Sequence, residues 1–273
     1  EDHDRKNIVT FTGGFHGRTM GALAVTPREK YQKAFRPLMS GVTVADFNDI
    51  DSAKAAIDAY TAAVIVEPIQ GEGGVNVATS EFLQALRELC NENGALLIFD
   101  EIQCGVGRTG KLWAYEHYDV TPDMMTLAKP LAGGLPMGAI LMTQQVADAI
   151  QPGDHGSTFA GGLAVSAVAC HVVERIADPD FLAHVAEVGA YLMERLEELN
   201  SPLIKEVRGE GLMVAMELTQ EAAPLIKQGY AHNLLLVNAG ANVMRFVPPL
   251  IVEKSDVDHL INELTGIMEQ INA

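Results

Sequence analysis

Short apolar runs recur along the first half of this 273-residue chain and predict buried β-strands. Runs of about four to eight apolar residues are typical of strands buried on both faces, as in a parallel sheet that is covered by helices. The predicted strands lie in "NIVTF" (residues 7–11), "GVTVADF" (41–47), "AAVIVEP" (62–68), "ALLIFDE" (95–101), "MMTLAK" (124–129) and "MGAILMT" (137–143).

The segment between two of these strands has the 3.6-residue period of an amphipathic helix. In "TSEFLQALRELCNENG" (79–94), Thr79 or Ser80 can cap the amino end, and Gly94 can end the helix. Strand, helix and strand in this order form a βαβ unit. The pattern therefore predicts an α/β fold, with a mostly parallel sheet flanked by helices.

After about residue 160 the pattern changes, which predicts a second, smaller domain. Two helical segments are followed by strand-like runs and by a final amphipathic helix, from Ser255 as its capping residue to about Ile271. Strand pairs backed by helices are typical of an α+β domain. We place the boundary in "IADPDF" (176–181), so that residues 1–178 form the large domain and residues 179–273 form the small C-terminal domain.

Composition narrows the function classes. The formal net charge is −17, which argues against nucleic acid or an anionic membrane as the partner. No apolar stretch reaches the length that spans a bilayer. The three cysteines, Cys90, Cys104 and Cys170, have an odd number and no metal-ligand spacing. We therefore expect no disulfide, no metal site and a reducing, cytoplasmic location.

Two carboxylates end the apolar part of "LLIFDEIQCGVGRTG" (96–110), and a glycine-rich loop follows them. An acid at this place suits either a magnesium–nucleotide site or a protonated heterocyclic nitrogen. "GVGRTGK" (105–111) matches the spacing of a phosphate-binding P-loop, but Leu112 stands where that motif needs Ser or Thr to bind the metal. The acids also precede the loop on the same strand, which disfavours the nucleotide site.

The alternative, a heterocyclic cofactor, requires a lysine that can form an imine. Lys129, in "TLAKPLAGGLPMGA" (126–139), follows a predicted strand and precedes a Gly-Gly loop. It is thereby placed near the carboxyl ends of the strands, where open α/β sheets bind ligands. By spacing alone, a solvated loop lysine explains this position better.

Six motifs occur in order along nearly the whole chain: "GGFHGRTMGAL" (13–23), "VEPIQGEGG" (66–74), "LLIFDEIQCGVGRTG" (96–110), "LAKPLAGGLPMGA" (127–139), "GDHGSTFAGG" (153–162) and "RFVPPLIV" (245–252). Together they resemble the class III pyridoxal-phosphate aminotransferases, which have the type I, aspartate-aminotransferase-like fold. "FHGRTMGAL" and "DHGSTFAGG" are most similar to the acetylornithine aminotransferase subfamily.

This resemblance implies pyridoxal 5'-phosphate as the cofactor. Lys129 would bind it as an imine, and Asp100 would pair with the pyridine nitrogen and keep it protonated. Gln103 would reach the phenolic oxygen of the ring, and Phe15 would pack on the ring face. Thr158 would lie near the cofactor phosphate of a neighbouring subunit, so that the resemblance also implies a homodimer with shared active sites.

Substrate contacts are implied for four more residues. Arg18 would hold the α-carboxylate of the amino donor or of 2-oxoglutarate, because a planar guanidinium bonds both carboxylate oxygens. Arg245 would bind the second carboxylate of 2-oxoglutarate, and Glu72 would pair with Arg245 when the donor lacks that carboxylate. Ser157, beside the phosphate-binding threonine, would also touch substrate.

The implied reaction is transamination. An ω-amino donor, N-acetylornithine by the subfamily resemblance, would pass its amino group to 2-oxoglutarate and give a semialdehyde and glutamate, as in arginine biosynthesis. Donors of the ornithine, 4-aminobutyrate or acetyl-lysine type stay open. So does a non-catalytic, cofactor-free protein of the same fold.

Three departures from the family pattern modify these expectations. The family segment that normally precedes "NIVTF" is missing, so we expect a large domain that is incomplete at its amino end. We also expect these 273 residues alone to bind the cofactor weakly. Pro130 follows the imine lysine, and Leu163 stands where the family has proline. Neither of these two changes removes a predicted catalytic group.

Overall fold

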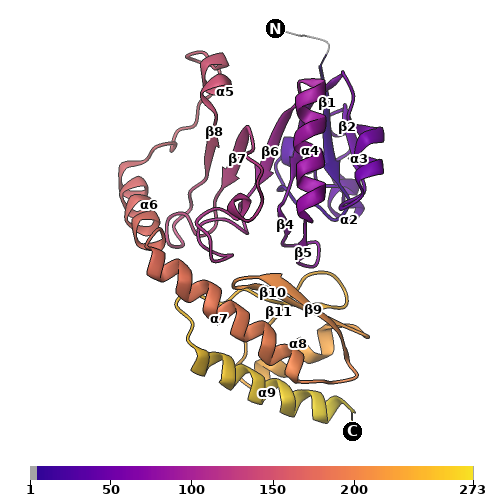
Figure 1. The fold of residues 1–273 in the computed structure, drawn as a ribbon, viewed down its shortest axis with the longest axis vertical. Helices are drawn as coiled ribbons and strands as arrows, with labels where there is room; N and C mark the ends of the chain where they lie inside the picture. The colour runs from indigo at the N-terminus through magenta and orange to yellow at the C-terminus, as the bar shows by residue number, and fades with distance from the viewer. Residues whose placement is uncertain (1–4, 273) are drawn as a thin grey trace.

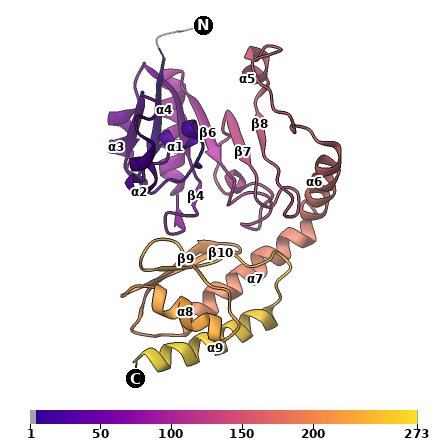
Figure 2. The same cartoon turned by 180° about the vertical axis from the view of Figure 1, so that it is seen from behind.

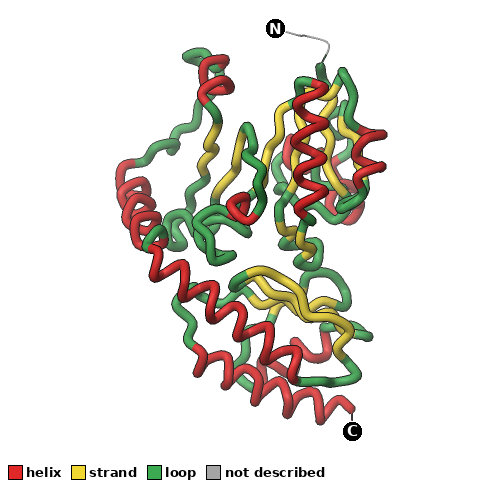
Figure 3. Tube along the Cα trace, in the orientation of Figure 1, coloured by secondary structure: helices red, strands yellow, loops and turns green. Residues whose placement is uncertain are grey.

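The computed structural model describes residues 5–272, which form two main β-sheets, connected by long helices, and one short hairpin (Figures 1 and 3). The strands of the larger sheet are β1 (Asn7–Phe11), β2 (Val42–Ala45), β3 (Thr61–Val66), β6 (Leu96–Asp100), β7 (Met124–Leu127) and β8 (Ala139–Met142). They lie in the order β2-β1-β3-β6-β7-β8. The β7–β8 pair is antiparallel and the other four pairs are parallel, which confirms the predicted mostly parallel α/β sheet.

Each strand of this sheet overlaps one of the six predicted runs, but the two faces of the sheet differ in burial. The face that carries Val64 of β3 and Phe99 of β6 has no exposed surface at these residues, whereas Ile65 and Ile98 on the opposite face are half-buried. The fully buried face packs on the helices α3 (Ile50–Ala56) and α4 (Ser80–Asn93). The prediction that both faces of the sheet are buried was therefore correct for one face only.

Helix α4 confirms the predicted βαβ unit in detail. The Thr79 hydroxyl caps it by accepting a hydrogen bond from the Phe82 N–H (3.2 Å), and Gly94 ends it with φ at 64°. The φ value is left-handed, which favours glycine at this position. The Phe82 ring packs edge-on against Phe11 of β1, with the ring centroids 5.2 Å apart. The helix thereby anchors the first half of the sheet.

The second sheet is antiparallel and has the order β11-β12-β10-β9. Its strands are β9 (Ile204–Glu210), β10 (Met213–Leu218), β11 (Val237–Asn238) and β12 (Val243–Phe246). The helices α7 (Pro179–Glu198), α8 (Ala223–Ala231) and α9 (Lys254–Asn272) share one hydrophobic core with it. Figures 1 and 2 show α7 running from the level of the larger sheet past the smaller one, beside α9.

The remaining elements lie between or beside the sheets. They are α1 (Met20–Ala24), α2 (Glu29–Gln32), η1 (Lys33–Phe35), β4 (Ile69–Gln70), β5 (Asn76–Val77), η2 (Ala114–His117), α5 (Gln144–Ala149) and α6 (Leu163–Ile176). The antiparallel hairpin β4–β5 contacts β9 of the smaller sheet and was not predicted. It is one of the segments that join the large sheet to the small one.

Two boundaries need comment. The predicted cap of the last helix was wrong: α9 begins at Lys254, and the Asp256 carboxylate accepts the Glu253 N–H (2.9 Å), so that Ser255 lies inside the first turn.

The division into two domains at residue 178 stays our proposal. It is supported by the start of α7 at Pro179, because this helix packs on the smaller sheet.

The described residues carry few features of other protein classes. All three cysteines are free thiols. Within residues 5–272, no helix is both long and apolar enough to cross a membrane, and no group of three or more His, Cys, Asp or Glu side chains is arranged to hold a metal ion.

A close approach of backbones holds α7 to the smaller sheet. A side-chain carbon at Gly189 of α7 would overlap with the carbonyl of Gly211, in the turn between β9 and β10. We expect Gly189→Ala to lower the free energy of unfolding by about 1–3 kcal/mol, because the helix must move away from the turn. Gly266→Ala in α9 is the matched control, since its added methyl group meets no atom within 4 Å.

Urea denaturation measures both variants. Alanine at residue 266 should raise the free energy of unfolding by up to about 1 kcal/mol, because alanine favours a helix over glycine. A Gly189→Ala variant as stable as the Gly266→Ala variant would contradict the close approach.

Candidate active site

Two neighbouring cavities lie at the carboxyl ends of β6 and β7. The acid-side cavity, of about 80 Å³, is lined by Phe15, His16, Gly17, Glu67, Asp100, Ile102, Gln103 and Lys129. The arginine-side cavity, of about 370 Å³, is lined by Glu72, Gln103, Arg108, Lys129, Pro130, Arg245 and Val247. Both lie at the sheet edge where parallel strands place ligands. Six of the nine predicted site residues line these two cavities, and three lie outside them.

Asp100 is the last residue of β6 and is buried, with 4% of its surface exposed. Its Oδ1 accepts hydrogen bonds from the Ile102 N–H (3.1 Å) and the Thr126 hydroxyl (3.0 Å). Nδ1 of His16 lies 2.7 Å from its Oδ2, at the distance of a hydrogen bond. A buried carboxylate is stabilised in its charged form by such donors, so Asp100 can face a cation in the cavity.

Glu67 is a second buried carboxylate in the acid-side cavity and was not predicted. It follows β3 directly, and it accepts hydrogen bonds from the Phe15 N–H (2.9 Å) and the Gly71 N–H (3.2 Å). Desolvation raises the pKa of Glu67 to about 7, although His16 and the two backbone donors oppose this rise. One carboxylate thus holds together the loop of Phe15 and the loop that leads to Glu72.

His16 and Glu67 were missed for the same reason. Both lie inside motifs that we quoted, "FHGR" and "VEPIQGEGG", but neither motif says which residue contacts a buried acid. The signal for Glu67 was present: like Asp100, it is an acid at the carboxyl end of a buried strand.

Lys129 follows β7 after a single residue and extends between the two cavities. Its side chain stays partly open to solvent. Even so, desolvation by the cavity walls lowers the pKa of its ammonium group, with Arg245 acting in the same direction, whereas Glu72, Glu67 and Asp100 oppose the shift. A lowered pKa leaves more of the neutral amine, which is the nucleophilic and basic form.

Arg245 on β12 reaches from the smaller sheet into this edge of the larger one. Its Nη1 donates to the carbonyl of Gly71 (2.9 Å), to Oε1 of Glu72 (2.9 Å) and to Oε1 of Gln103 (2.8 Å). Burial disfavours the charged form of Glu72, but the hydrogen bond and charge of Arg245 outweigh it and lower the pKa of Glu72. The predicted Arg245–Glu72 pair is thus formed in the structure.

The comparison with known families decides the identity of this arrangement. The model of the family "Aminotransferase class-III" matches residues 1–268. The chain belongs to the class III aminotransferase family.

Relatives of this class III aminotransferase chain agree with that assignment. It is 51% identical over 262 residues to "Acetylornithine aminotransferase, mitochondrial" of Alnus glutinosa, covering 94% of this chain and 58% of that one. It is 45% identical over 272 residues to the acetylornithine aminotransferase of Clostridium acetobutylicum, covering 98% of this chain and 69% of that one. The chain thus spans about three fifths to two thirds of the length of these relatives.

Solved structures show the same fold. An ornithine aminotransferase from Toxoplasma gondii superposes with a TM-score of 0.94 at 31% identity, covering 100% of this chain and 66% of that one. A second structure of that enzyme, crystallised with oxidised glutathione, has partial occupancy of pyridoxal phosphate (PLP) at its active site.

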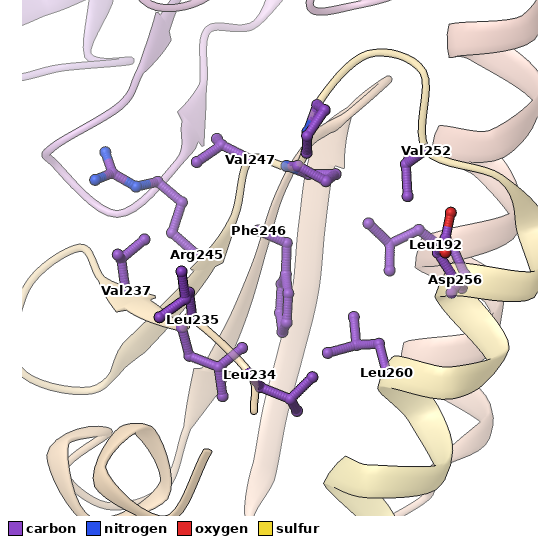
Figure 4. A pocket seen from close by; sticks show the side chains of 14 residues that line it. Leu192, Leu234, Leu235, Val237, Arg245, Phe246, Val247, Val252, Asp256 and Leu260 are labelled. Atoms are coloured by element: carbon purple, nitrogen blue, oxygen red, sulfur yellow. The ribbon is translucent and has the colours of Figure 1, made fainter. Parts of the chain in front are cut away.

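Figure 4 shows why Arg245 of this class III chain faces the cavity that holds Lys129. Its guanidinium points away from a group of apolar side chains that includes Leu192, Phe246 and Leu260. These side chains line a separate cavity of about 400 Å³ between β12, α7 and α9. Nη1 of Arg245 instead donates to Glu72 and Gln103.

Two further arginines join the sheets beside the cavities, and neither was predicted to do so. Arg108 Nη1 donates to the carbonyls of Leu212 (3.1 Å) and Pro248 (2.6 Å), and burial lowers its pKa to about 10. Arg208 on β9 donates to the Gly74 carbonyl through Nε (3.1 Å) and Nη2 (2.7 Å). Arg208 and Arg245 thus hold the loop of Glu72 from the smaller sheet, and Arg108 holds the larger sheet to the smaller one.

Three predicted substrate or phosphate contacts lie outside the two cavities. Arg18 is exposed, and its guanidinium stacks on Tyr31, with Cζ 3.7 Å from the ring centroid. Ser157 and Thr158 are exposed on the loop between α5 and α6. Their roles stay predictions, because the contacts foreseen for Thr158 involve a neighbouring subunit.

The lining residues fit the ring of PLP. Asp100 suits a protonated ring nitrogen, Phe15 has an aromatic face, Gln103 has an amide donor and Lys129 has the amine that binds an aldehyde. The described lining of the two cavities contains no serine or threonine for a phosphate. Such donors have to come from elsewhere, as foreseen for Thr158.

Glu101, the second acid of the "FDE" sequence, has a structural role. It is completely buried and accepts hydrogen bonds from the Ala114 N–H (2.7 Å) and the Tyr115 N–H (2.8 Å), and it lines neither cavity. Burial raises its pKa from 4.5 to about 7. The folded state therefore binds a proton more tightly than the unfolded chain does.

This shift predicts a pH-dependent stability. Because the folded-state pKa of Glu101 is the higher one, its contribution to the free energy of unfolding falls as the pH rises from 4.5 to about 7, by about 3 kcal/mol in all. Urea denaturation between pH 5 and 8 should show a smaller fall for Glu101→Gln than for the wild type. Glu92→Gln, on the exposed side of α4, is the control and should follow the wild type. Parallel curves for Glu101→Gln and Glu92→Gln would contradict the assignment.

Proposed function

We propose that this chain carries the catalytic groups of a PLP-dependent aminotransferase. It moves the amino group of an ω-amino donor, N-acetylornithine, to 2-oxoglutarate and releases a semialdehyde and glutamate. The observation that carries the proposal is the meeting of Lys129, Asp100 and Gln103 at two adjoining cavities, with the Arg245–Glu72 pair on the far side. When bound, the cofactor supplies an electron sink.

Asp100 and Lys129 divide the proton chemistry between them. Asp100 holds a proton on the ring nitrogen, because its charge is fixed in place by Ile102, Thr126 and His16. Lys129 binds the cofactor aldehyde and, once released, moves a proton to or from the substrate carbon. The desolvation that lowers its pKa suits that role as a base near neutral pH.

The Arg245–Glu72 pair lets one cavity accept two differently charged substrates. With a donor that lacks a second carboxylate, Glu72 neutralises Arg245 at 2.9 Å. With 2-oxoglutarate, Arg245 leaves Glu72 and binds the second carboxylate of the substrate. The buried Nε of Arg245 has no hydrogen-bond partner among the described residues, so one N–H donor of the guanidinium is unused.

We prefer N-acetylornithine as the donor, because the two relatives described above are both named acetylornithine aminotransferases. Ornithine is the second candidate, which the TM-score of 0.94 to an ornithine aminotransferase supports. Arg18 binds the α-carboxylate of the donor or that of 2-oxoglutarate. Ser157 and Thr158 serve the neighbouring subunit of a homodimer, which accords with their position on an exposed loop. We place the protein in the cytoplasm, because its cysteines are free.

Lys129→Ala tests the cofactor bond. The 273-residue chain is incubated with PLP, treated with borohydride, digested and mapped by mass spectrometry. We expect a reduced adduct on Lys129 in the wild type and its loss in Lys129→Ala, because a methyl group cannot form an imine. Lys111→Ala, an exposed lysine of the glycine-rich loop, should keep the adduct. An adduct that persists in Lys129→Ala would refute the assignment.

Arg245→Leu tests the substrates by separating the two half-reactions. Removal of a charge-assisted bidentate contact should raise the KM for 2-oxoglutarate by about 10- to 100-fold or more. The half-reaction with N-acetylornithine should change less, since this donor has no second carboxylate for Arg245 to bind. Single-turnover absorbance of the bound cofactor follows each half, with ornithine and 4-aminobutyrate as competing donors. Equal losses in both halves would contradict the switch, and faster turnover of ornithine would favour the second candidate.

A further inference from the structure

Gln103 connects the two cavities. Among the lining residues that the structure describes, only Gln103 and Lys129 belong to both. Gln103 lies three residues after Asp100, in the turn that follows β6, and Arg245 approaches it from β12 of the other sheet. The amide therefore joins Arg245 by one hydrogen bond to a residue that lines the acid-side cavity.

The orientation of the Gln103 amide is set by chemistry. Arg245 can only donate hydrogen bonds, so the group that faces its Nη1 at 2.8 Å has to be the oxygen Oε1. Gly71 packs so closely on the amide that a side chain at this position would overlap with it. Nε2 accordingly remains as the donor, and it forms no hydrogen bond with another residue within 5–272.

Arg245 has more acceptors than its Nη1 can serve fully. Two N–H bonds face the oxygens of Gly71, Glu72 and Gln103, at 2.8 to 2.9 Å. When Arg245 turns to a substrate carboxylate, its hydrogen bonds to these three oxygens weaken or break. The bond to Gln103 thus changes together with the bond to Glu72.

We propose that Gln103 is a positioning residue that transmits the state of the Arg245–Glu72 pair to the cofactor bound at Lys129. The inference rests on the proposed function. With Arg245 paired to Glu72, the amide is polarised and oriented, and Nε2 donates strongly to the phenolic oxygen of the cofactor ring. With Arg245 turned to a dicarboxylate, that donation weakens. The strength of the hydrogen bond from Gln103 to the cofactor at Lys129 thereby depends on which substrate occupies the arginine-side cavity.

The direction of the effect follows from the charge on the phenolic oxygen. A donor stabilises this oxygen most when the nitrogen that joins Lys129 to the cofactor is deprotonated, since that nitrogen then offers the oxygen no proton. Donation from Gln103 therefore lowers the pKa of the Lys129-bound cofactor. Hydrogen-bonded chains strengthen each member, so Arg245 increases this lowering through the amide.

The test is a double-mutant cycle on that pKa, read from the pH-dependent absorbance of the bound cofactor. Gln103→Leu should raise it by roughly 0.5 to 1 pH unit, the size expected for one hydrogen bond. Arg245→Leu should raise it in the wild-type background and clearly less in the Gln103→Leu background. The coupling between the two sites is the signature of the transmission.

Charges act on this pKa through space as well, and a control removes their effect. The groups around Gln103 and Lys129 are His16, Glu67, Glu72, Asp100, Arg108 and Arg245. Arg108→Gln deletes a cation from the same cavity that has no hydrogen bond to Gln103, so its effect should be equal in both backgrounds. Gln103→Glu, which accepts from Arg245 but cannot donate to the phenolic oxygen, should raise the pKa more than Gln103→Leu does.

A second measurement avoids the risk that Arg245→Leu fails to fold. Glutarate, a dicarboxylate without an oxo group, should raise the pKa of the wild type more than that of Gln103→Leu. Equal effects of Arg245→Leu and of glutarate in both backgrounds would overturn the transmission while leaving the proposed function intact. Absence of a borohydride-reducible adduct in the wild type would overturn the proposed function, and the transmission with it.

Discussion

A carboxylate shielded from water needs hydrogen bonds from the protein, and Asp100 places this demand on three segments. The loop after β1 supplies His16, the turn after β6 supplies the N–H of Ile102, and β7 supplies the hydroxyl of Thr126. An unpaired buried charge costs several kcal/mol, so these segments have to converge on the tip of β6. Their convergence also places Phe15 and Lys129 beside the same cavity.

The second requirement is contact between the two sheets. Arg208 and Arg245 cross from the smaller sheet to oxygens of the Glu72 loop, and Arg108 crosses from the larger sheet to the carbonyl of Pro248. Arginine suits such crossings because its donors are held in a rigid fork and it remains charged when partly buried. The arginine-side cavity is thus made by both sheets, and a displacement of either one changes the partners of Arg245.

Much of the fold was predictable because its signals are local. Continuous apolar runs located the six strands, and Thr79 and Gly94 marked the ends of α4. The hairpin β4–β5 was missed, since two-residue strands within a glycine-rich loop have no periodic pattern. Ser255 was wrongly taken as a cap because capping chemistry was also available at Asp256, whose carboxylate binds the N–H of Glu253.

For the site, the resemblance to the class III family indicated Asp100, Lys129, Gln103 and the Arg245–Glu72 pair, and their placement at one sheet edge agrees with the role proposed for each. The same reasoning said nothing of the bond between His16 and Asp100, or of the two loops that Glu67 holds together. Those bonds join residues of separate motifs, and no motif by itself indicates which other motif it contacts.

The sequence by itself determined the strands, the main helix of the large sheet and the chemistry available at the carboxyl end of β6, because apolar periodicity and acid or lysine side chains are properties of short segments. Only the tertiary structure decided that Arg245 contacts Gln103, 142 residues away in the chain, that Glu101 is structural while Asp100 faces the cavity, and that Arg18 stacks on Tyr31 outside it. Hydrogen bonds between distant segments depend on how the two sheets pack, and packing leaves no local pattern.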